Sequence, residues 1–154
     1  MESIPTLDWV SVSPSELSAR DLTTWAIRPN CGAVVTFCGT ARNNSAAHGE
    51  IEALEYETSE ELAEKSILEI IAAARTRWPA IGAVAIHHRT GKISLSEAAV
   101  VVAVSSPHRQ EAFEAALFCI DTLKESVPMW KREIWRDGSA WSTDTRTILK
   151  VREP

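Results

Sequence analysis

The sequence predicts an α+β fold with a mainly antiparallel sheet and helices packed on it. Two observations support this class. Segments with apolar residues at helical spacing alternate with short β-branched runs. Several predicted strands also follow one another without a helix between them, as strands linked by hairpins do. No linker rich in Pro, Gly or Ser divides the 154 residues, so residues 1–154 are expected to form one domain with a flexible tail from about residue 143.

The first third of the chain is expected to contain two strands and a helix. Residues 8–12 have the pattern of a short strand. The segment Ser13-Pro14-Ser15-Glu16 predicts a helix start with Ser as the N-cap and Pro in the first turn, and the helix is expected to reach about Ile27. The apolar, β-branched run Ala33–Cys38 is typical of a buried strand, and polar or small residues at 43–49 predict a loop.

The middle of the chain is expected to contain three strands and a long helix. Residues 51–56 alternate apolar and acidic side chains, which predicts a strand with one wet face. The segment Thr58-Ser59-Glu60-Glu61 predicts a capping box for a helix that runs through Trp78. Strands are expected at 82–88 and 98–104 with a turn near Gly91, and the second, nearly all Val and Ala, is expected to be central.

The last third begins with a predicted helix. Ser106-Pro107 marks its start, and Pro128 ends it just after Val127. A strand is expected at 130–135, followed by a turn at Asp137-Gly138.

Charge and cysteine content exclude several classes of protein. Sixteen basic and twenty-one acidic residues give a net charge of −5, so broad binding to nucleic acid or to a membrane surface is not expected. The cysteines at positions 31, 38 and 119 form no C-x-x-C pair, which argues against a disulfide framework or a zinc ribbon and indicates a reducing cytoplasm. The N-terminus lacks a secretory signal pattern, and no apolar run is long enough to span a membrane.

Metal binding is not expected either. No set of His, Cys and Asp residues has the spacing of metal ligands. The adjacent His87 and His88 stand at a predicted strand end, where we expect a structural or hydrogen-bonding role. Cys38 lies in an apolar run without an activating base, which disfavours a nucleophilic role.

The third predicted helix carries a lysine among its apolar residues. At 100° per residue, the expected core stripe consists of Phe113, Ala116, Leu117, Ile120 and Val127, and Lys124 falls within it. A lysine there is either held in a desolvated pocket, where a lowered pKa suits it to acid, base or nucleophilic catalysis, or extended past the last turn, where the helix dipole favours cations. Geometry alone leaves both interpretations open.

Other basic residues indicate an anion site. His108 and Arg109 stand at the start of the same helix, where free N–H groups and positive side chains together favour an anion. The alternative is that Arg109 pairs with Glu111 or Glu114. Arg42 follows the strand at 33–38 after a glycine-containing turn, where it is placed to reach a ligand or is an ordinary surface arginine.

A second lysine lies on the last predicted strand. The pleat directs Lys131 and Glu133 to one face and Arg132 to the other. Because Lys124 and Lys131 flank Pro128, a tight reversal there is expected to bring both amines to one pocket. The alternative is an ordinary exposed strand.

Taken together and in order, several segments resemble the molybdopterin synthase large (catalytic) subunit family. They cover roughly residues 31–141, and the helix motif followed by two lysines around Pro-x-Trp is specific in combination. The matching segments are Cys31–Arg42, Leu54–Glu57, His88–Gly91, Ser106–Phe113, Asp121–Lys124 and Pro128–Glu133.

The resemblance implies an α/β-hammerhead fold and a sulfurtransferase. Such an enzyme converts cyclic pyranopterin monophosphate to molybdopterin, with two sulfurs taken from the C-terminal thiocarboxylate of a small ubiquitin-like carrier subunit. It implies a homodimer of large subunits within a heterotetramer, and no metal or organic cofactor.

Residue roles follow from the resemblance by position. Lys124 and Lys131 match the family's catalytic lysines, and Arg42, His108 and Arg109 match its substrate-pocket residues. The family also tends to have an arginine beyond residue 141 that reaches into the neighbouring site. Thr145 and Arg146 are the nearest candidates for that position.

Three other interpretations remain. A non-catalytic subunit that binds a partner's tail and a phosphate ligand would keep Arg42 and Arg109 without needing Lys124 in an apolar stripe. An unrelated phosphate-ester hydrolase would use the same basic residues with a general base such as His108, and would act without a carrier. A plain structural α+β domain would leave all of these residues solvated.

Overall fold

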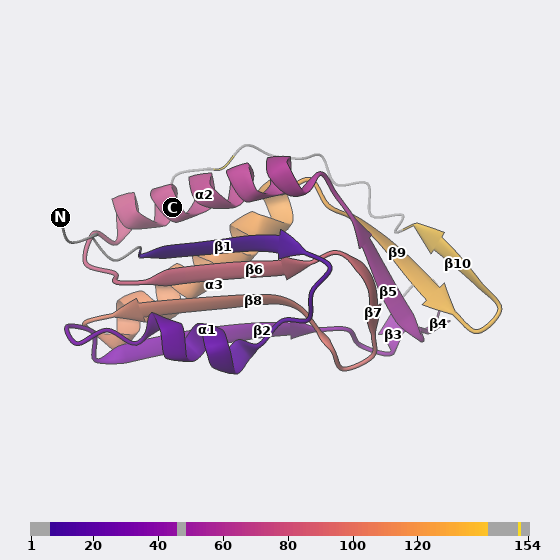
Figure 1. Ribbon diagram of the computed structural model, residues 1–154, viewed down its shortest axis with the longest axis horizontal. Coiled ribbons are helices and arrows are strands. Elements are labelled where there is room, and N and C mark those ends of the chain that lie inside the picture. The colour runs from indigo at the N-terminus through magenta and orange to yellow at the C-terminus, as the bar shows by residue number, and fades with distance from the viewer. Residues whose placement is uncertain (1–6, 46–48, 142–150, 152–154) are drawn as a thin grey trace.

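The computed structural model describes residues 7–45, 49–141 and 151, and these fold into two main sheets with helices on the first (Figure 1). The strand order of the first sheet is β1-β6-β8-β2, and that of the second is β10-β9-β5-β7. Every strand pair of the two sheets is antiparallel except β1 with β6, which confirms the predicted class. The strands of the first sheet are β1 (Asp8–Ser13), β6 (Val84–Arg89), β8 (Ala98–Ser106) and β2 (Ala33–Thr40). Those of the second are β10 (Gly138–Trp141), β9 (Trp130–Trp135), β5 (Ala53–Glu57) and β7 (Gly91–Ser94).

Helices cover both faces of the first sheet. The helices α2 (Glu60–Arg77) and α3 (Arg109–Ser126) pack on one face, and α1 (Ala19–Ala26) packs on the other. Strand β8 lies inside the sheet, as predicted, and its successive side chains point alternately into the cores on the two faces. Val102 and Val104 belong to the core under α2 and α3, whereas Val101 and Ala103 belong to the core under α1.

The first helix begins later than predicted. Ser13 ends β1 and pairs with Arg89, so it is not a helix cap. The N-cap is Ser18, whose Oγ accepts a hydrogen bond from the backbone N–H of Asp21 at 3.1 Å. The sequence contains two serines with an acidic residue three positions later, and pairing with β6 decides between them by keeping the first in the strand.

The prediction of a buried strand at 33–38 is wrong. Strand β2 is an edge strand of the first sheet, and none of its residues is fully buried. Phe37 remains 36% exposed. An apolar run is compatible with a central strand and with an edge strand that another surface covers, so composition alone does not distinguish them.

Two strands of the second sheet were not predicted. The turn at Gly91, where φ is +79°, is present, but the chain continues from it into β7. Similarly, the turn at Asp137-Gly138 leads into β10, which pairs with β9. The expected loop at 43–49 contains the two-residue strands β3 (Asn44–Ser45) and β4 (Gly49–Glu50), which pair with each other.

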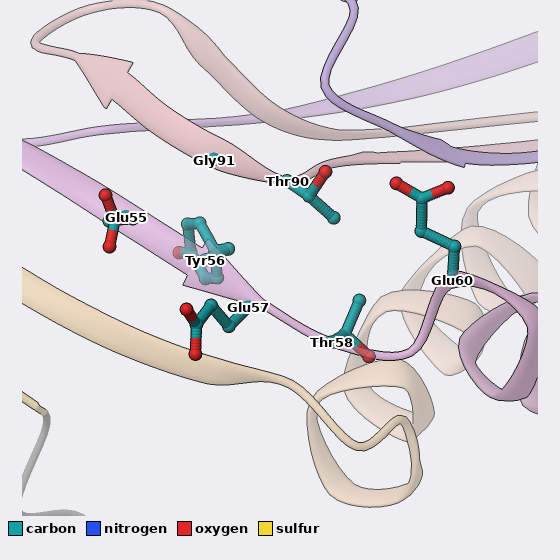
Figure 2. Close-up of a pocket in the computed structure, with 7 residues that line it drawn as sticks. All are labelled: Glu55, Tyr56, Glu57, Thr58, Glu60, Thr90 and Gly91. Atoms are coloured by element: carbon teal, nitrogen blue, oxygen red, sulfur yellow. The ribbon is translucent and has the colours of Figure 1, made fainter.

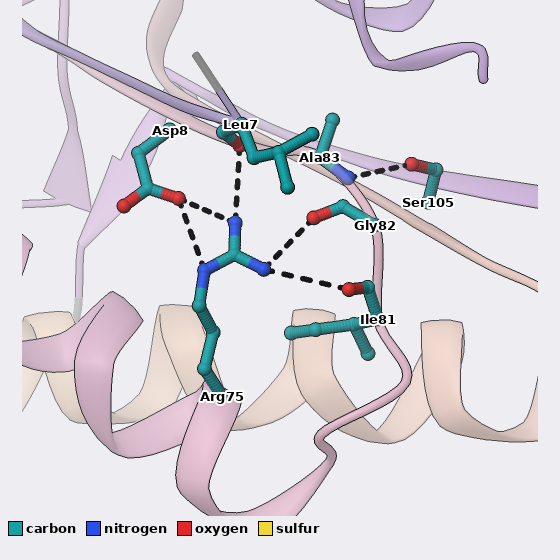
Figure 3. Close-up of polar contacts among 7 residues, drawn as sticks. All are labelled: Leu7, Asp8, Arg75, Ile81, Gly82, Ala83 and Ser105. Carbon is teal, nitrogen blue, oxygen red and sulfur yellow. Dashed lines mark hydrogen bonds and ion pairs between the residues drawn. The ribbon is translucent and has the colours of Figure 1, made fainter. Parts of the chain in front are cut away.

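The side chain of Arg75 connects α2 to the first sheet through an ion pair and hydrogen bonds (Figure 3). The guanidinium of Arg75 forms an ion pair with Asp8 and donates hydrogen bonds to the carbonyl oxygens of Leu7 at 3.1 Å and Gly82 at 2.9 Å. A longer contact of 3.4 Å reaches the carbonyl of Ile81. These bonds satisfy the backbone at the start of β1 and before β6, so α2 holds the two parallel strands side by side.

After residue 141, the structure describes one residue, Val151. Val151 is half-buried and packs against the core cluster that α2 and α3 form with the sheet. The rest of the predicted tail, with the candidates Thr145 and Arg146, lies outside the described residues. Among the helices that the structure describes, none is both long enough and apolar enough to cross a membrane.

Candidate active site

Lys131 lies on the inner face of the second sheet. In the β5–β9 ladder it stands opposite Tyr56, and Glu133 stands opposite Leu54. Tyr56 and Leu54 pack in the small core between the two sheets, and residues opposite each other in a ladder share a face, so Lys131 and Glu133 face this core too. Glu133 is 6% exposed. Arg132 points the other way and forms an ion pair with Glu55, which confirms the predicted division of the strand.

The amine of Lys131 is unusual in its surroundings. Its side chain is half-buried, and among residues 7–45, 49–141 and 151 it has no hydrogen-bond or ion-pair partner. The other half-buried cations have partners: Arg75 pairs with Asp8, Arg89 with Glu97, and Arg132 with Glu55. A half-buried amine without a carboxylate partner is available to a ligand.

Aromatic rings make the surroundings of Lys131 partly dry. The ring of Tyr56 meets that of His88 edge-on, with 4.9 Å between centroids. Burial raises the pKa of Tyr56, so the phenol is neutral at physiological pH. Burial also lowers the pKa of His88 to about 4, against the weaker effect of its hydrogen bond with the Arg89 backbone, so this ring is neutral as well. The expected structural role of His88 agrees with this packing.

Lys124 is exposed, and the predicted core stripe of α3 is only partly confirmed: Ala116, Ile120 and Val127 are buried. Phe113 and Leu117, which were expected inside, are 62% and 61% exposed, and Lys124 lies on their side of the helix. The residues that pack inward are mostly small and lie on the adjacent side. They are Ala112, Ala115, Ala116, Cys119, Ile120, Thr122, Leu123 and Ser126.

The two sides of α3 could not be distinguished from apolarity. Small residues such as Ala115 let the helix approach the sheet closely, whereas Phe113 and Leu117 extend from the adjacent side. The expected desolvation of Lys124 is therefore absent in the single chain. Its position in the last turn of α3, where the helix dipole favours a cation, matches the alternative interpretation.

Arg42 lies at the same end of the molecule as the two lysines. It follows Ala41, a buried residue whose backbone bonds to the β7–β8 connection: its N–H donates to Glu97 at 3.1 Å and its carbonyl accepts from Ser96 at 2.9 Å. The next residue, Asn43, accepts a hydrogen bond from the N–H of Ile51 just before β5. Arg42 itself is exposed and has no ion-pair partner among the described residues.

His108 and Arg109 lie at the opposite end (Figure 1). The fifteen residue steps from Arg109 to Lys124 along α3 correspond to about 22 Å at 1.5 Å per residue. The alternative interpretation, in which Arg109 pairs with Glu111 or Glu114, is not what the structure shows, because neither pair is formed. Glu114 instead accepts hydrogen bonds from Gln110 at 3.1 Å and from the indole of Trp78 at 2.9 Å. A single chain thus places Arg42, Lys124 and Lys131 at one end and His108 with Arg109 at the other.

A pocket beside β5 has the wrong charge for a phosphate ester (Figure 2). It has a volume of about 340 Å³. Three carboxylates and no cation line it, so an anionic ligand would be repelled there. The lining residues are Glu55, Tyr56, Glu57, Thr58, Glu60, Thr90 and Gly91.

Comparison with known proteins gives the family of the chain. A family model described as MoaE protein matches residues 12–126. The chain belongs to the MoaE protein family. A molybdopterin synthase catalytic subunit from Taeniopygia guttata is 42% identical over 134 residues, which are 87% of this chain and 86% of that protein. The human subunit of the same name is 39% identical over 134 residues, 87% of this chain and 70% of that protein.

The fold of this MoaE protein is also that of a solved relative. The crystal structure of molybdopterin synthase from Staphylococcus aureus matches with a TM-score of 0.80 and 37% identity, over 86% of this chain and 95% of that chain. The family resemblance found in the sequence is thereby confirmed. The chain is similar to enzymes named as catalytic subunits, which supports an enzymatic role.

The part of this MoaE protein that the structure describes has no cluster of metal ligands, and its cysteines differ in exposure. No group of three or more His, Cys, Asp or Glu residues there is arranged to hold a metal ion. Cys119 is buried under α3, and burial raises the pKa of its thiol to about 12, so it is not a nucleophile at neutral pH. Cys38 is exposed on β2 rather than enclosed in a core.

Two residues near the site were missed from sequence. Tyr56 lies beside Lys131 because of the strand register, which the sequence did not specify. Thr58 was predicted to cap α2, but the N-cap is Ser59, whose Oγ accepts from the N–H of Leu62 at 3.4 Å. The presence of two adjacent hydroxyl residues was the signal that one of them is free for another contact.

Proposed function

We propose that this chain is the sulfurtransferase subunit that converts cyclic pyranopterin monophosphate to molybdopterin. It would take two sulfurs from the C-terminal thiocarboxylate of a small ubiquitin-like carrier subunit. Similarity to molybdopterin synthase catalytic subunits over 87% of the chain supports this function. The observation that carries it is the half-buried amine of Lys131, which has no hydrogen-bond or ion-pair partner among the described residues and lies at the end of the molecule that also holds Lys124 and Arg42.

The two lysines divide the chemistry in this proposal. Lys124 transfers protons or bonds transiently to the thiocarboxylate carbon. Lys131, on the drier inner face of β9, stabilises developing negative charge or protonates a leaving oxygen. Arg42 holds the phosphate with two parallel hydrogen bonds. The chain needs no metal or organic cofactor for these steps.

A second copy of the chain would complete the substrate pocket. Because His108 and Arg109 lie about 22 Å along α3 from Lys124, they serve the pocket of the neighbouring subunit rather than their own. The exposed Phe113 and Leu117 offer an apolar surface for this contact. Leu117 stands eight residues after Arg109 and seven before Lys124. A twofold axis near Leu117 therefore places Arg109 of one copy opposite Lys124 of the other.

The remaining partners and the location follow from the same family. The relatives carry the name catalytic subunit, which implies at least one further subunit. A homodimer with one carrier at each outer end gives a heterotetramer, in which each carrier tail enters near Lys124 and Lys131. Three free cysteines fit a reducing cytoplasm.

Turnover with a defined donor tests the proposed function. The full chain is mixed with thiocarboxylated carrier and cyclic pyranopterin monophosphate, and the dithiolene product is followed by mass spectrometry. Lys124→Ala and Lys131→Ala are each expected to slow product formation by about 10²–10⁴. Lys65→Ala is the matched control, because Lys65 is an exposed lysine on α2.

Each alternative has its own outcome in this assay. Normal turnover by both lysine variants would show that the catalytic assignment is wrong. Carrier binding without any product from the wild-type chain would indicate a non-catalytic subunit. Phosphate release without carrier would indicate a hydrolase. A carrier that ends in an ordinary carboxylate serves as the negative control.

A further inference from the structure

The connection between the two lysines is a short link, residues 127–129, that joins α3 to β9. Its first residue, Val127, is 3% exposed, and its N–H donates to the carbonyl of Leu123 at 3.0 Å. Met129 is half-buried against the same core cluster. One side of the link is therefore fixed by the end of α3 and by the core.

The other side of the link is held by a side chain from a distant part of the sequence. The hydroxyl of Thr58, just after β5, donates a hydrogen bond to the carbonyl oxygen of Pro128, 70 residues away. In Figure 2 this hydroxyl points toward the link between α3 and β9. The β5–β9 ladder ends with Glu57 opposite Trp130, so the Thr58 bond adds one further connection beyond the last pair.

Capping of the nearby helix does not account for a threonine at position 58. Ser59 caps α2, so the Thr58 hydroxyl is not required there. Within the part of the chain that the structure describes, its only other hydrogen bond is a longer one, 3.3 Å, to the carbonyl of Ser59. A hydroxyl has one proton to donate, and the shorter contact to Pro128 takes it. Because Pro128 has no N–H, its backbone can be held through its carbonyl oxygen but not through a backbone donor. The Thr58 hydroxyl bonds to that carbonyl and so fixes the link.

We infer that Thr58 is a positioning residue for sulfur transfer, because its hydrogen bond to Pro128 sets where Lys124 and Lys131 stand relative to each other. The inference rests on the proposed roles of the two lysines. Lys124 lies four residues before Pro128 and Lys131 three residues after it, so a shift of the link moves both amines. A misplacement of about 1 Å at a reacting group can cost a hundredfold in rate.

Two substitutions at one position separate the hydroxyl from the shape of the side chain. Thr58→Val keeps the shape and removes the donor, and Thr58→Ser keeps the donor. Thr58→Val is expected to lower kcat about tenfold or more, with KM for carrier and pterin within about twofold and a fall in Tm of no more than about 4 °C. Thr58→Ser is expected to retain kcat within about threefold of wild type.

The matched control is another threonine with a bonded hydroxyl. Thr76, exposed on α2, donates to the carbonyl of Ala72 at 3.1 Å, away from the link. Thr76→Val is expected to match the wild-type kcat. Amide hydrogen exchange gives a readout without turnover: exchange at Met129 and Lys131 should be faster in Thr58→Val than in wild type and unchanged in Thr76→Val.

The outcomes separate this inference from the proposed function. If Lys124→Ala and Lys131→Ala are inactive while Thr58→Val turns over normally, the positioning role is overturned and the proposed function stands. A slow Thr58→Val that Thr58→Ser does not restore, or unchanged exchange at the link, also overturns it. Full activity of the two lysine variants overturns the proposed function, and the positioning role with it.

Discussion

Activity restored by co-expressing two impaired variants is the sharpest consequence of the proposed dimer and of the position of α3 in it. Arg109 and Lys124 are about 22 Å apart along one helix, so a pocket that uses both ends of α3 must draw them from two copies of the chain. Arg109→Ala and Lys131→Ala are made in separate chains with different affinity tags and are co-expressed. Each variant alone carries its lesion in both pockets of the dimer.

The size of the recovery follows from the symmetry of a dimer. Loss of the Arg109 guanidinium removes charged hydrogen bonds of about 1.5–3 kcal/mol, which corresponds to a loss of about 10- to 150-fold in turnover. Loss of Lys131 is expected to cost about 10²–10⁴. Random pairing makes about half of the dimers mixed, and one of the two pockets in each mixed dimer has both wild-type residues. The mixture should therefore show about a quarter of wild-type activity.

The assay is dithiolene formation by the co-expressed mixture and by mixed dimers purified through both tags. The purified mixed dimers should reach about half of wild-type activity per dimer. If Arg109 and Lys131 act within one chain, every pocket of a mixed dimer lacks one of them and no recovery occurs. Activity no higher than that of the separate variants would refute the shared pocket.

Three further predictions concern the dimer surface and the stability of the fold. Leu117→Asp should raise the dissociation constant of the dimer about thirtyfold or more in sedimentation, because burial of one Leu117 side chain from each copy is worth about 2–4 kcal/mol. The chain should stay folded, because Leu117 is 61% exposed in the single chain. His88 has a folded-state pKa of about 4 against 6.5, so the unfolded chain takes up a proton that the folded chain does not, and stability is lost as pH falls from about 6.5 to about 4. The loss should reach about 3 kcal/mol in urea unfolding, and His88→Gln should remove it. Arg75→Met should lower the free energy of unfolding by about 2–3 kcal/mol, whereas Arg20→Met on the exposed side of α1 should change it by less than about 0.5 kcal/mol.

Much of the fold follows from local patterns in the sequence. The helix α2 and the strands β8 and β9 each show their helix or strand pattern within one short stretch of sequence. The start of α1 was missed because two serines satisfy the same capping pattern, and only pairing of Ser13 with Arg89 decides between them. The strand β7 was missed because its partner, β5, is distant in sequence.

The site was predictable in its residue types but not in its arrangement. The face of Lys131 followed from the pleat of one strand, and the structure agrees. The surroundings of Lys124 did not follow, because α3 has an apolar side of large residues and an adjacent side of small ones. The sheet accepts the small side, which a periodicity count cannot decide. Contacts from distant segments, such as Thr58 with Pro128, depend on register and were not accessible from sequence.

The alanines on the inner side of α3 have a consequence for which substitutions the proposed shared pocket would tolerate. Ala112, Ala115 and Ala116 let the first half of the helix lie close to the sheet, so a larger side chain at any of these positions would displace α3. Because the proposed pocket draws Arg109 from the first turn of α3 and Lys124 from the last, such a displacement would alter both pockets of the proposed dimer.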